Sequence, residues 1–209
     1  MKNKVILVLA PHTDDGELGA GGYIHKSIES GAHVTYVAFS DCKESVPEGF
    51  KKNILSLECR EATNVLGIQD VRILDFSVRG FSEYRQDILD ILIDLRNELN
   101  PDEVLTPSTS DIHQDHSVVT KEAIRAFKHR TILGYELPWN CMHFNAHYFI
   151  ELSDLNINKK MAALDKYESQ KNRIYFKDHF LLDYAKLRGR LVDIDYAEVF
   201  EVIRKVQKI

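Results

Sequence analysis

Short apolar runs alternate along the chain with longer segments whose apolar residues recur every three or four positions. The runs predict strands over residues 5–10, 33–39, 71–74, 103–106 and 131–135, with an edge strand over 147–150. The first run, VILVLA, contains no polar position. Such a run is typical of a parallel strand that is covered on both faces.

The intervening segments predict helices over residues 17–30, 51–66, 84–99, 117–128, 154–170 and 196–208. Gly31 and Gly67 end the first two helices, and Asn100-Pro101 ends the third. Strands and helices that alternate at this length imply a mainly parallel sheet with helices on both faces. No linker or internal repeat interrupts the pattern, so we expect residues 1–209 to form a single α/β domain.

Composition narrows the class of protein. The 209 residues are 44% hydrophobic and carry a net charge of −5, without a basic run, which does not suggest a nucleic-acid partner. No apolar stretch reaches the roughly 18 residues that a transmembrane helix needs. The three cysteines are scattered and form no C-x-x-C pair, which fits a reduced, cytoplasmic setting.

Candidate chemistry begins directly after the first strand, in PHTDDGELGAGG, residues 11–22. His12 and Asp15 are three positions apart on a turn, and an imidazole with a carboxylate suits a divalent metal such as zinc. Asp14, between them, could face a metal-bound water. One alternative is a helix N-terminus with aspartate caps. Another is a nucleotide loop, but G-x-G-x-x-G is missing and two carboxylates would repel a pyrophosphate.

A second stretch, SDIHQDHSVV (residues 110–119), repeats this mixture with His113, Asp115 and His116. It also follows a predicted strand, and ligands of parallel sheets bind beyond the carboxyl ends of the strands. We therefore expect both stretches at one edge of the sheet. Three protein ligands plus a water are the catalytic form of zinc, which leaves a fourth candidate, His113, for other work. The alternative is a capping aspartate beside solvated histidines.

These motifs resemble a known family. PHTDDGELGAGG is similar to the P/A-H-P-D-D-E-x-x-G-x-G-G signature of the PIG-L/LmbE-like zinc-dependent N-deacetylases, and DIHQDH to its H-P-D-H signature. Further resemblances, in the family's order, are ECREATNVLGIQDVRILDF, LNPDEVLTPSTSDIHQDH, KMAALDKYESQ and AKLRGRLVDIDYAEVF. Together they extend over nearly the whole chain. The resemblance implies a Rossmann-like three-layer α/β domain.

The resemblance also implies a chemistry. Members of the family remove acetyl groups from N-acetylglucosamine units on various aglycones by means of metal-activated water. For this chain it implies zinc, or another divalent metal, bound by His12, Asp15 and His116. It further implies Asp14 as the general base and His113 as the acid and oxyanion partner, with Asp115 behind His113 as its orienting carboxylate.

Three departures from the family pattern stand out. Thr13 replaces a proline and Gly16 an acidic residue, and neither position is a ligand. Leu55 occupies the place where many members carry an arginine that grips the substrate. Candidates to replace that arginine are Arg60, Arg79 and Arg85. The only tryptophan, in residues 136–144, could line a sugar pocket or belong to a core loop.

The leading hypothesis is thus a metal-dependent N-deacetylase, a hydrolase of an acetamido-sugar conjugate. The second is a metal-dependent hydrolase of another amide or ester. The third is a non-catalytic sugar- or nucleotide-binding module, which would be expected to have lost Asp14 or a ligand. The expected partner is a small-molecule substrate, and the sequence leaves a homo-oligomer open.

Overall fold

The computed structural model describes residues 3–207, and a sheet of seven strands runs through this part of the chain. The strands are β1 Val5–Ala10, β2 His33–Ala38, β3 Asp70–Ile73, β4 Glu103–Pro107, β5 Thr131–Tyr135, β6 Tyr148–Glu151 and β7 Ala197–Arg204. Their order across the sheet is β3-β2-β1-β4-β5-β7-β6. The first five pair in parallel, whereas β7 runs antiparallel to both β5 and β6.

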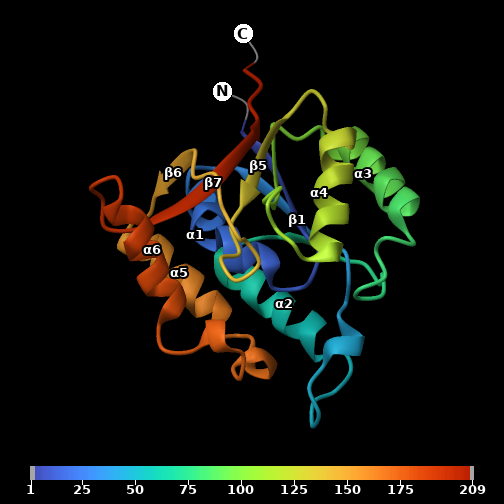
Figure 1. Ribbon diagram of the computed structural model, residues 1–209, viewed down its shortest axis with the longest axis horizontal. Coiled ribbons are helices and arrows are strands. Elements are labelled where there is room, and N and C mark those ends of the chain that lie inside the picture. The colour runs from blue at the N-terminus through green and yellow to red at the C-terminus, as the bar shows by residue number, and fades with distance from the viewer. Residues whose placement is uncertain (1–2, 208–209) are drawn as a thin grey trace.

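Helices cover both faces of the sheet (Figure 1). One layer consists of α1 Asp15–Glu29, α2 Ile54–Leu66, α5 Asp154–Leu164 and α6 Phe180–Arg190. The other consists of α3 Arg85–Leu99 and α4 Gln114–Ala126. This arrangement confirms the predicted three-layer α/β fold.

Strand β1 shows why the apolar run predicted a buried parallel strand. Ile6 and Val8 point into the core beneath α1, α2 and α5. Leu7 and Leu9 point into the core beneath α3 and α4. All four side chains are fully buried, because successive residues of a strand point to opposite faces and both faces are covered here.

The predicted helix over residues 196–208 is wrong as far as the structure describes it, because residues 197–204 form β7. Glu198 and Glu201 of this strand are both buried. Each of these carboxylates accepts several hydrogen bonds. Glu198 and Glu201 are three positions apart and so point to opposite faces of the strand, and each finds its donors on its own face. Two smaller differences are that α5 ends at Leu164 rather than at residue 170, and that α6 was not predicted.

The sheet order brings the two candidate motifs together. β1 and β4 are neighbouring parallel strands, with Ile6 opposite Glu103 and Val8 opposite Leu105. The turns that follow them therefore leave the same edge of the sheet side by side. The prediction that both motifs lie at one edge is confirmed.

Candidate metal and catalytic site

The turn after β1 is built around the Asp15 carboxylate. Asp15 is the first residue of α1, and its Oδ2 accepts the backbone N–H of His12 at 2.8 Å. This bond holds the His12 ring over the N-terminus of the helix. Gly16 follows because a side chain would collide with Tyr36, whose Cε2 lies 2.5 Å from the position of an added Cβ. The family's acidic residue would not fit at this position.

The turn after β4 is built in a similar way around Asp111. The Oδ1 of Asp111 accepts the backbone N–H of His113 at 2.8 Å, and its Oδ2 lies 2.7 Å from Nδ1 of His116. His113 is the N-cap of α4, and His116 lies in the first turn of that helix. One buried carboxylate therefore fixes both histidines of this motif.

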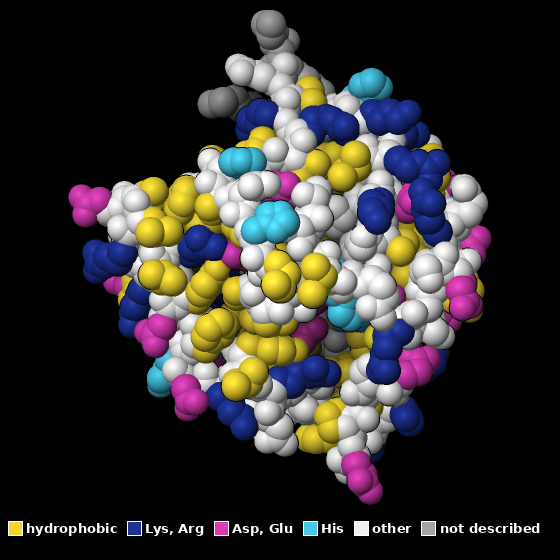
Figure 2. All heavy atoms as spheres, viewed as in Figure 1, with side chains coloured by type: hydrophobic (Ala, Val, Ile, Leu, Met, Phe, Trp, Pro, Cys, Tyr) yellow, Lys and Arg dark blue, Asp and Glu magenta, His cyan; other side chains and the backbone are white. Residues whose placement is uncertain are grey.

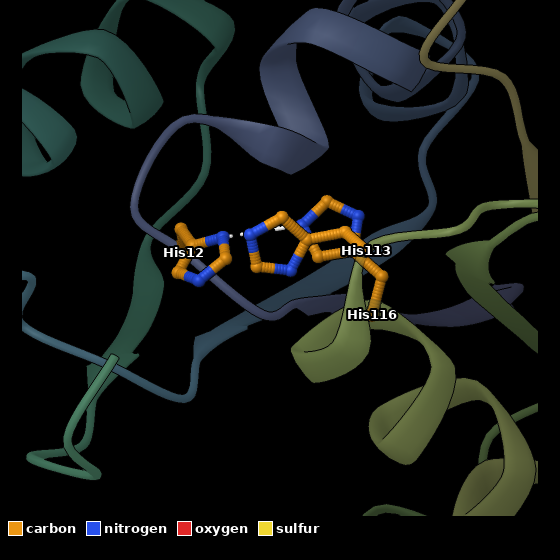
Figure 3. A group of neighbouring side chains, drawn as sticks. All are labelled: His12, His113 and His116. Atoms are coloured by element: carbon orange, nitrogen blue, oxygen red, sulfur yellow. Dashed lines mark hydrogen bonds between the residues drawn. The ribbon is translucent and has the colours of Figure 1, made fainter. Parts of the chain in front are cut away.

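The rings of His12, His113 and His116 converge from these two turns (Figure 3). Nδ1 of His12 lies 3.1 Å from Nε2 of His116, and each of these atoms lies 3.2 Å from Oδ2 of Asp15. Tetrahedral zinc with bonds of about 2.0–2.1 Å separates its ligand atoms by about 3.3 Å. His113 offers an atom within 4.8 Å of the two other imidazoles, which is a looser grouping.

Two further carboxylates fix the tautomers of the converging rings. Oδ2 of Asp115 lies 3.1 Å from Nε2 of His12, and Oδ2 of Asp111 contacts Nδ1 of His116. Because a carboxylate only accepts, each neutral ring donates from that nitrogen and directs its other lone pair toward Asp15. Two imidazole nitrogens and one carboxylate oxygen then face one point, which suits a cation.

Asp115 differs from the expectation in its partner. Its carboxylate contacts His12 rather than His113, and it also accepts the backbone N–H of Arg79 at 2.6 Å. Towards His113 it offers only its backbone N–H, which donates to Nδ1 at 3.3 Å. The side-chain contact that the resemblance implies with His113 is made with His12 instead.

The surplus of carboxylates favours positive charge at this point. Burial would lower the pKa of His12, but Asp15 and Asp115 raise it to about 9. Burial would likewise lower the pKa of His116, but Asp15 and Asp111 raise it to about 10. Despite its burial, the two imidazoles hold the pKa of Asp15 well below its usual range. Protons or a metal cation would balance these charges, and a metal would displace the protons.

Asp14 has a different environment from Asp15. Burial, and then the charge of Asp15, raise the pKa of Asp14 to about 6, against the opposing charges of His12 and Arg173. Its side chain faces the site cavity. Two adjacent carboxylates with pKa values pushed apart can therefore serve different roles.

His113 is held in a neutral form in this environment. Burial lowers its pKa, and the charges of His116 and His12 lower it further. Since its Nδ1 accepts the Asp115 N–H, the neutral ring carries its proton on Nε2. The protonated His113 that the family mechanism suggests is thus disfavoured, although an N–H donor remains.

These groups open into a cavity of about 320 Å³. One wall holds Trp139 and Tyr175, stacked at a centroid distance of 4.0 Å and an interplanar angle of 8°. Leu55 lines the cavity, as do two arginines, Arg79 and Arg173. Figure 2 shows this face hollowed, with histidine and acidic side chains set deep and basic side chains at the margin.

Comparison with known proteins agrees with the motifs. The family described as GlcNAc-PI de-N-acetylase, PIG-L, matches residues 7–127, more than half of the chain. This chain belongs to the PIG-L family. The structure of a *Pyrococcus horikoshii* N,N′-diacetylchitobiose deacetylase in complex with an inhibitor shares the fold, with a TM-score of 0.81 at 24% identity. That similarity covers 96% of this chain and 84% of the other.

Two curated relatives of this PIG-L chain are deacetylases by name. Diacetylchitobiose deacetylase of *Thermococcus kodakarensis* is 27% identical over 87% of the chain. A probable N-acetyl-alpha-D-glucosaminyl L-malate deacetylase 2 of *Bacillus cereus* is 28% identical over 58% of the chain. The matches span 64% and 60% of those proteins' own lengths. None of the described helices is long and apolar enough to cross a membrane.

Sequence reasoning missed three residues of this PIG-L site: Asp111, Arg173 and Tyr175. A signal existed for Asp111, because it lies two positions before His113 in a motif already rich in ligands. No local signal marked Arg173 and Tyr175, which lie at the start of and within a short 3-10 helix, Ile174–Phe176, far along the chain. Of the arginines considered as substitutes, Arg60 donates to the Val71 carbonyl and Arg85 pairs with Glu122, and only Arg79 lines the cavity.

Proposed function

We propose that this protein is a metal-dependent N-deacetylase that releases acetate from an N-acetylglucosamine-type conjugate. The observation that carries the proposal is the triangle of Nδ1 of His12, Oδ2 of Asp15 and Nε2 of His116, whose edges are 3.1–3.2 Å. The names of the curated relatives support the acetamido-sugar substrate.

The donor set suits zinc or a similar divalent ion. His12, Asp15 and His116 would hold it, with Asp115 and Asp111 behind the two imidazoles. Two nitrogens and one oxygen leave an open position, as catalytic rather than structural sites do. When bound, the ion supplies Lewis acidity and lowers the pKa of a water molecule toward neutrality.

Asp14 would act as the general base. Water adds its oxygen to the acetyl carbon, and Asp14 accepts the proton that the water loses. The bond from carbon to nitrogen then breaks, and the nitrogen receives a proton as it leaves. The products are acetate and a free amine. A carboxyl group whose pKa is raised to about 6 can both accept and return this proton near neutral pH.

His113 would stabilise the oxyanion of the tetrahedral intermediate. Its Nδ1 is occupied by the Asp115 N–H, so a neutral ring directs Nε2–H as a hydrogen-bond donor. A fixed donor of this kind typically contributes on the order of 10²- to 10³-fold to turnover. This role needs no imidazolium, in contrast to the protonated group that the motif suggested.

The wall of Trp139 and Tyr175 would bind the apolar face of the sugar ring. The cavity of about 320 Å³ can enclose one such unit but not a macromolecule. A net charge of −5 supports a small-molecule substrate rather than a nucleic acid. We place this whole function on a single domain, since one sheet includes strands from residue 5 to residue 204.

A second candidate is a hydrolase of another amide or ester. The observation in its favour is Leu55, which is 3% exposed and gives the cavity wall an apolar surface where the family pattern has an arginine. The same metal ligands and base would serve that reaction. Only the pocket would select a different acyl group or leaving group.

Metal analysis and acetate release test the proposal together. Purified protein should contain about one divalent ion per chain, and it should release acetate from at least one N-acetylglucosamine glycoside. The His116→Ala variant should lose both metal and activity. Full occupancy with unchanged turnover in that variant would remove His116 from the ligand set. Metal without any acetate release, but with turnover of other amides or esters, would favour the second candidate.

A further inference from the structure

Two tyrosine hydroxyls meet at the carbonyl group behind the proposed base. The hydroxyl oxygens of Tyr167 and Tyr36 lie 2.7 and 3.0 Å from the carbonyl oxygen of Thr13. That carbonyl belongs to the peptide bond with Asp14, so its position sets where the Asp14 backbone leads into α1. Tyr36 comes from β2, and Tyr167 comes from the segment after α5. Two distant elements therefore converge on one peptide group of the site.

The carboxyl group of Glu17 holds both hydroxyls from another side. Its Oε1 lies 2.8 Å from the Tyr167 hydroxyl, and its Oε2 contacts the Tyr36 hydroxyl. All three side chains are fully buried, and Thr13 is 1% exposed. Of the described residues that line the cavity, none is Tyr36, Tyr167 or Glu17. These groups therefore touch the turn that carries the base, and not a molecule in the cavity.

A second buried carboxylate keeps Tyr167 in place. The backbone N–H and the hydroxyl of Ser169 donate to Glu58 on α2 at 2.8 and 2.5 Å, and both residues are buried. This contact ties the segment that carries Tyr167 to α2. Tyr36 has its own support, because it lies in β2 opposite Val8 of β1 in the strand ladder. Both hydroxyls are thus presented by fixed parts of the fold.

The sequence of the turn explains why it needs such support. Thr13 stands where the family pattern has a proline, whose ring would fix the φ angle of that residue. Threonine leaves this rotation free. Asp14 is the N-cap of α1, yet within the described part of the chain its side chain makes no capping hydrogen bond. The hydrogen bonds at the Thr13 carbonyl take the place of both constraints.

We propose that Tyr36 and Tyr167 are positioning residues for the general base. Held by Glu17, their hydroxyls fix the peptide bond that precedes Asp14 and keep its carboxylate directed at the reacting water. This inference rests on the proposed hydrolase function, in which Asp14 accepts the proton of that water. A misplacement of about 1 Å can lower turnover by about 100-fold. The two hydroxyls therefore act on kcat without contacting the substrate.

Tyr167→Phe and Tyr36→Phe remove each hydroxyl and keep the ring. Each variant should lower kcat for methyl N-acetylglucosaminide by about 10-fold, with KM and metal content within about twofold of wild type. Both together should cost no more than Asp14→Asn, because they act only through that base. The matched control is Tyr135→Phe, which should keep kcat within about twofold. Its buried hydroxyl donates to the Leu9 carbonyl at 2.9 Å, in a strand that the ladder already fixes.

The Asp14→Asn background separates positioning from general support of the fold. There, Tyr167→Phe should change the residual kcat by less than about twofold, because no base is left to position. A further 10-fold loss in that background would mean that the hydroxyl acts independently of Asp14, and would overturn the proposal. Wild-type kcat in both single phenylalanine variants would also overturn it. So would a fall in kcat that only follows an equal fall in metal content.

Variants of Glu17 test the group that holds the hydroxyls. Glu17→Gln keeps the shape and can still contact both hydroxyls, so kcat should stay within about threefold of wild type. Glu17→Leu should lower kcat about as much as the phenylalanine variants do. Equal losses in the glutamine and leucine variants would remove Glu17 from its assigned role.

A combined variant remains informative if a single change unfolds the chain. Tyr36→Phe, Tyr167→Phe and Glu17→Leu together leave no polar side chain of this group buried without a partner, so the fold should persist. This variant should bind metal and lose about 10- to 100-fold in kcat. A folded, metal-loaded chain with wild-type kcat would refute the positioning role.

Failure of the proposed function gives a different result. If no acetamido sugar releases acetate but p-nitrophenyl acetate is hydrolysed, the same comparisons apply to that ester, since the second candidate function uses the same base. If neither is hydrolysed, crystal structures of the metal-loaded wild type and combined variant decide. The Asp14 carboxylate should move by more than about 0.5 Å or occupy several orientations in the variant. An identical position in both would overturn the positioning role.

Discussion

Two buried charged clusters contact α1, one along the middle of the helix and one at its N-terminus, and they are balanced in opposite ways. Beside the middle of the helix, Nζ of Lys160 donates to Glu198 at 2.7 Å and to the Leu18 carbonyl at 2.8 Å. Glu198 also accepts the backbone N–H groups of Gly22 and Tyr23 at 2.9 and 2.6 Å. Every charge in this cluster has an opposite charge or a donor beside it.

The cluster at the N-terminus of α1 has the reverse composition. Three carboxylates, Asp15, Asp111 and Asp115, surround two imidazoles whose remaining lone pairs face each other. A buried cluster with more acceptors than donors is unfavourable unless protons or a cation complete it. Burial of charge alone therefore does not distinguish a structural cluster from a functional one, whereas the donor balance does.

The largest expected effect separates chemistry from metal binding inside the unbalanced cluster. Asp14→Asn should lower kcat by about 10²- to 10⁴-fold, because the amide cannot accept a proton, while metal content and KM stay close to wild type. Asp15→Asn should instead lower metal content. Metal analysis and steady-state kinetics on both variants check this. The reverse pattern would exchange the roles of the two carboxylates, and full turnover in Asp14→Asn would place the base elsewhere.

Substitutions in the balanced cluster of Lys160 and Glu198 should lower the stability of the fold. Lys160→Met leaves Glu198 buried without its cation, and we expect a loss of about 3–5 kcal/mol in the free energy of unfolding. Glu198→Gln in the same chain should recover part of this loss, since it removes the uncompensated charge. Urea denaturation measures both, and metal content per folded chain should not change. A loss below about 1 kcal/mol would mean that Lys160 and Glu198 do not form the buried ion pair described.

The orienting carboxylates should have a smaller effect, confined to metal binding. Asp111→Asn and Asp115→Asn should each weaken metal affinity by about 10- to 100-fold, because His116 and His12, respectively, would lose the anionic acceptor of their ring N–H. Asp102→Asn is the matched control, because that carboxylate accepts the Val5 N–H at the other end of β1 from the proposed metal ligands. Competition with a chelator gives the affinities. Unchanged affinity in both site variants would show that the ligands need no such support.

The smallest effect is expected at a partly exposed pair, Arg72 and Asp70, where solvent screens the charges. The hydrogen bonds from Arg72 hold the pKa of Asp70 below its ordinary value of 3.8. Its stabilisation is therefore present above about pH 4 and is lost as pH falls through the lower pKa of the folded state. Asp70→Asn should cost about 0.5 kcal/mol or less at pH 7 and nothing in strong acid. Unfolding curves at both pH values would expose any larger contribution.

Local patterns predicted the residues that lie close together along the chain. The apolar run of β1 and the spacing of His12 to Asp15 were sufficient, because the turn between them is short. The prediction that His113 and His116 lie beside this turn required only that two parallel strands end at the same edge, whereas the choice of His116 as a ligand rests on the resemblance to the family. The same reasoning failed for residues 197–204, which form a strand and not the predicted helix, since Glu198 and Glu201 are polar in sequence and buried in the fold. Their partners, among them Lys160 and Ser108, are distant in the chain.

Arg173 and the partner of Asp115 were not predictable for a related reason. Arg173 donates to Gln170, which is linked through Ser169 to Glu58. Glu58 precedes Arg173 by more than a hundred positions, and no periodicity connects the two. Asp115 contacts His12 across the gap between two strands rather than its neighbour His113. Contacts of this kind depend on the packed arrangement of several elements, whereas hydrophobic period reports only one element at a time.

The place of β7 in the sheet has a consequence for the order of folding. This strand lies between β5 and β6, although both precede it in the chain. Its Glu201 accepts hydrogen bonds from Ser108 and Thr109, at the start of the turn that carries the second histidine pair. Until residues 197–204 join the sheet, β5 keeps an unpaired edge and that turn lacks its anchor. Contacts so distant in sequence form slowly, so metal-binding competence should be among the last properties that a refolding chain acquires.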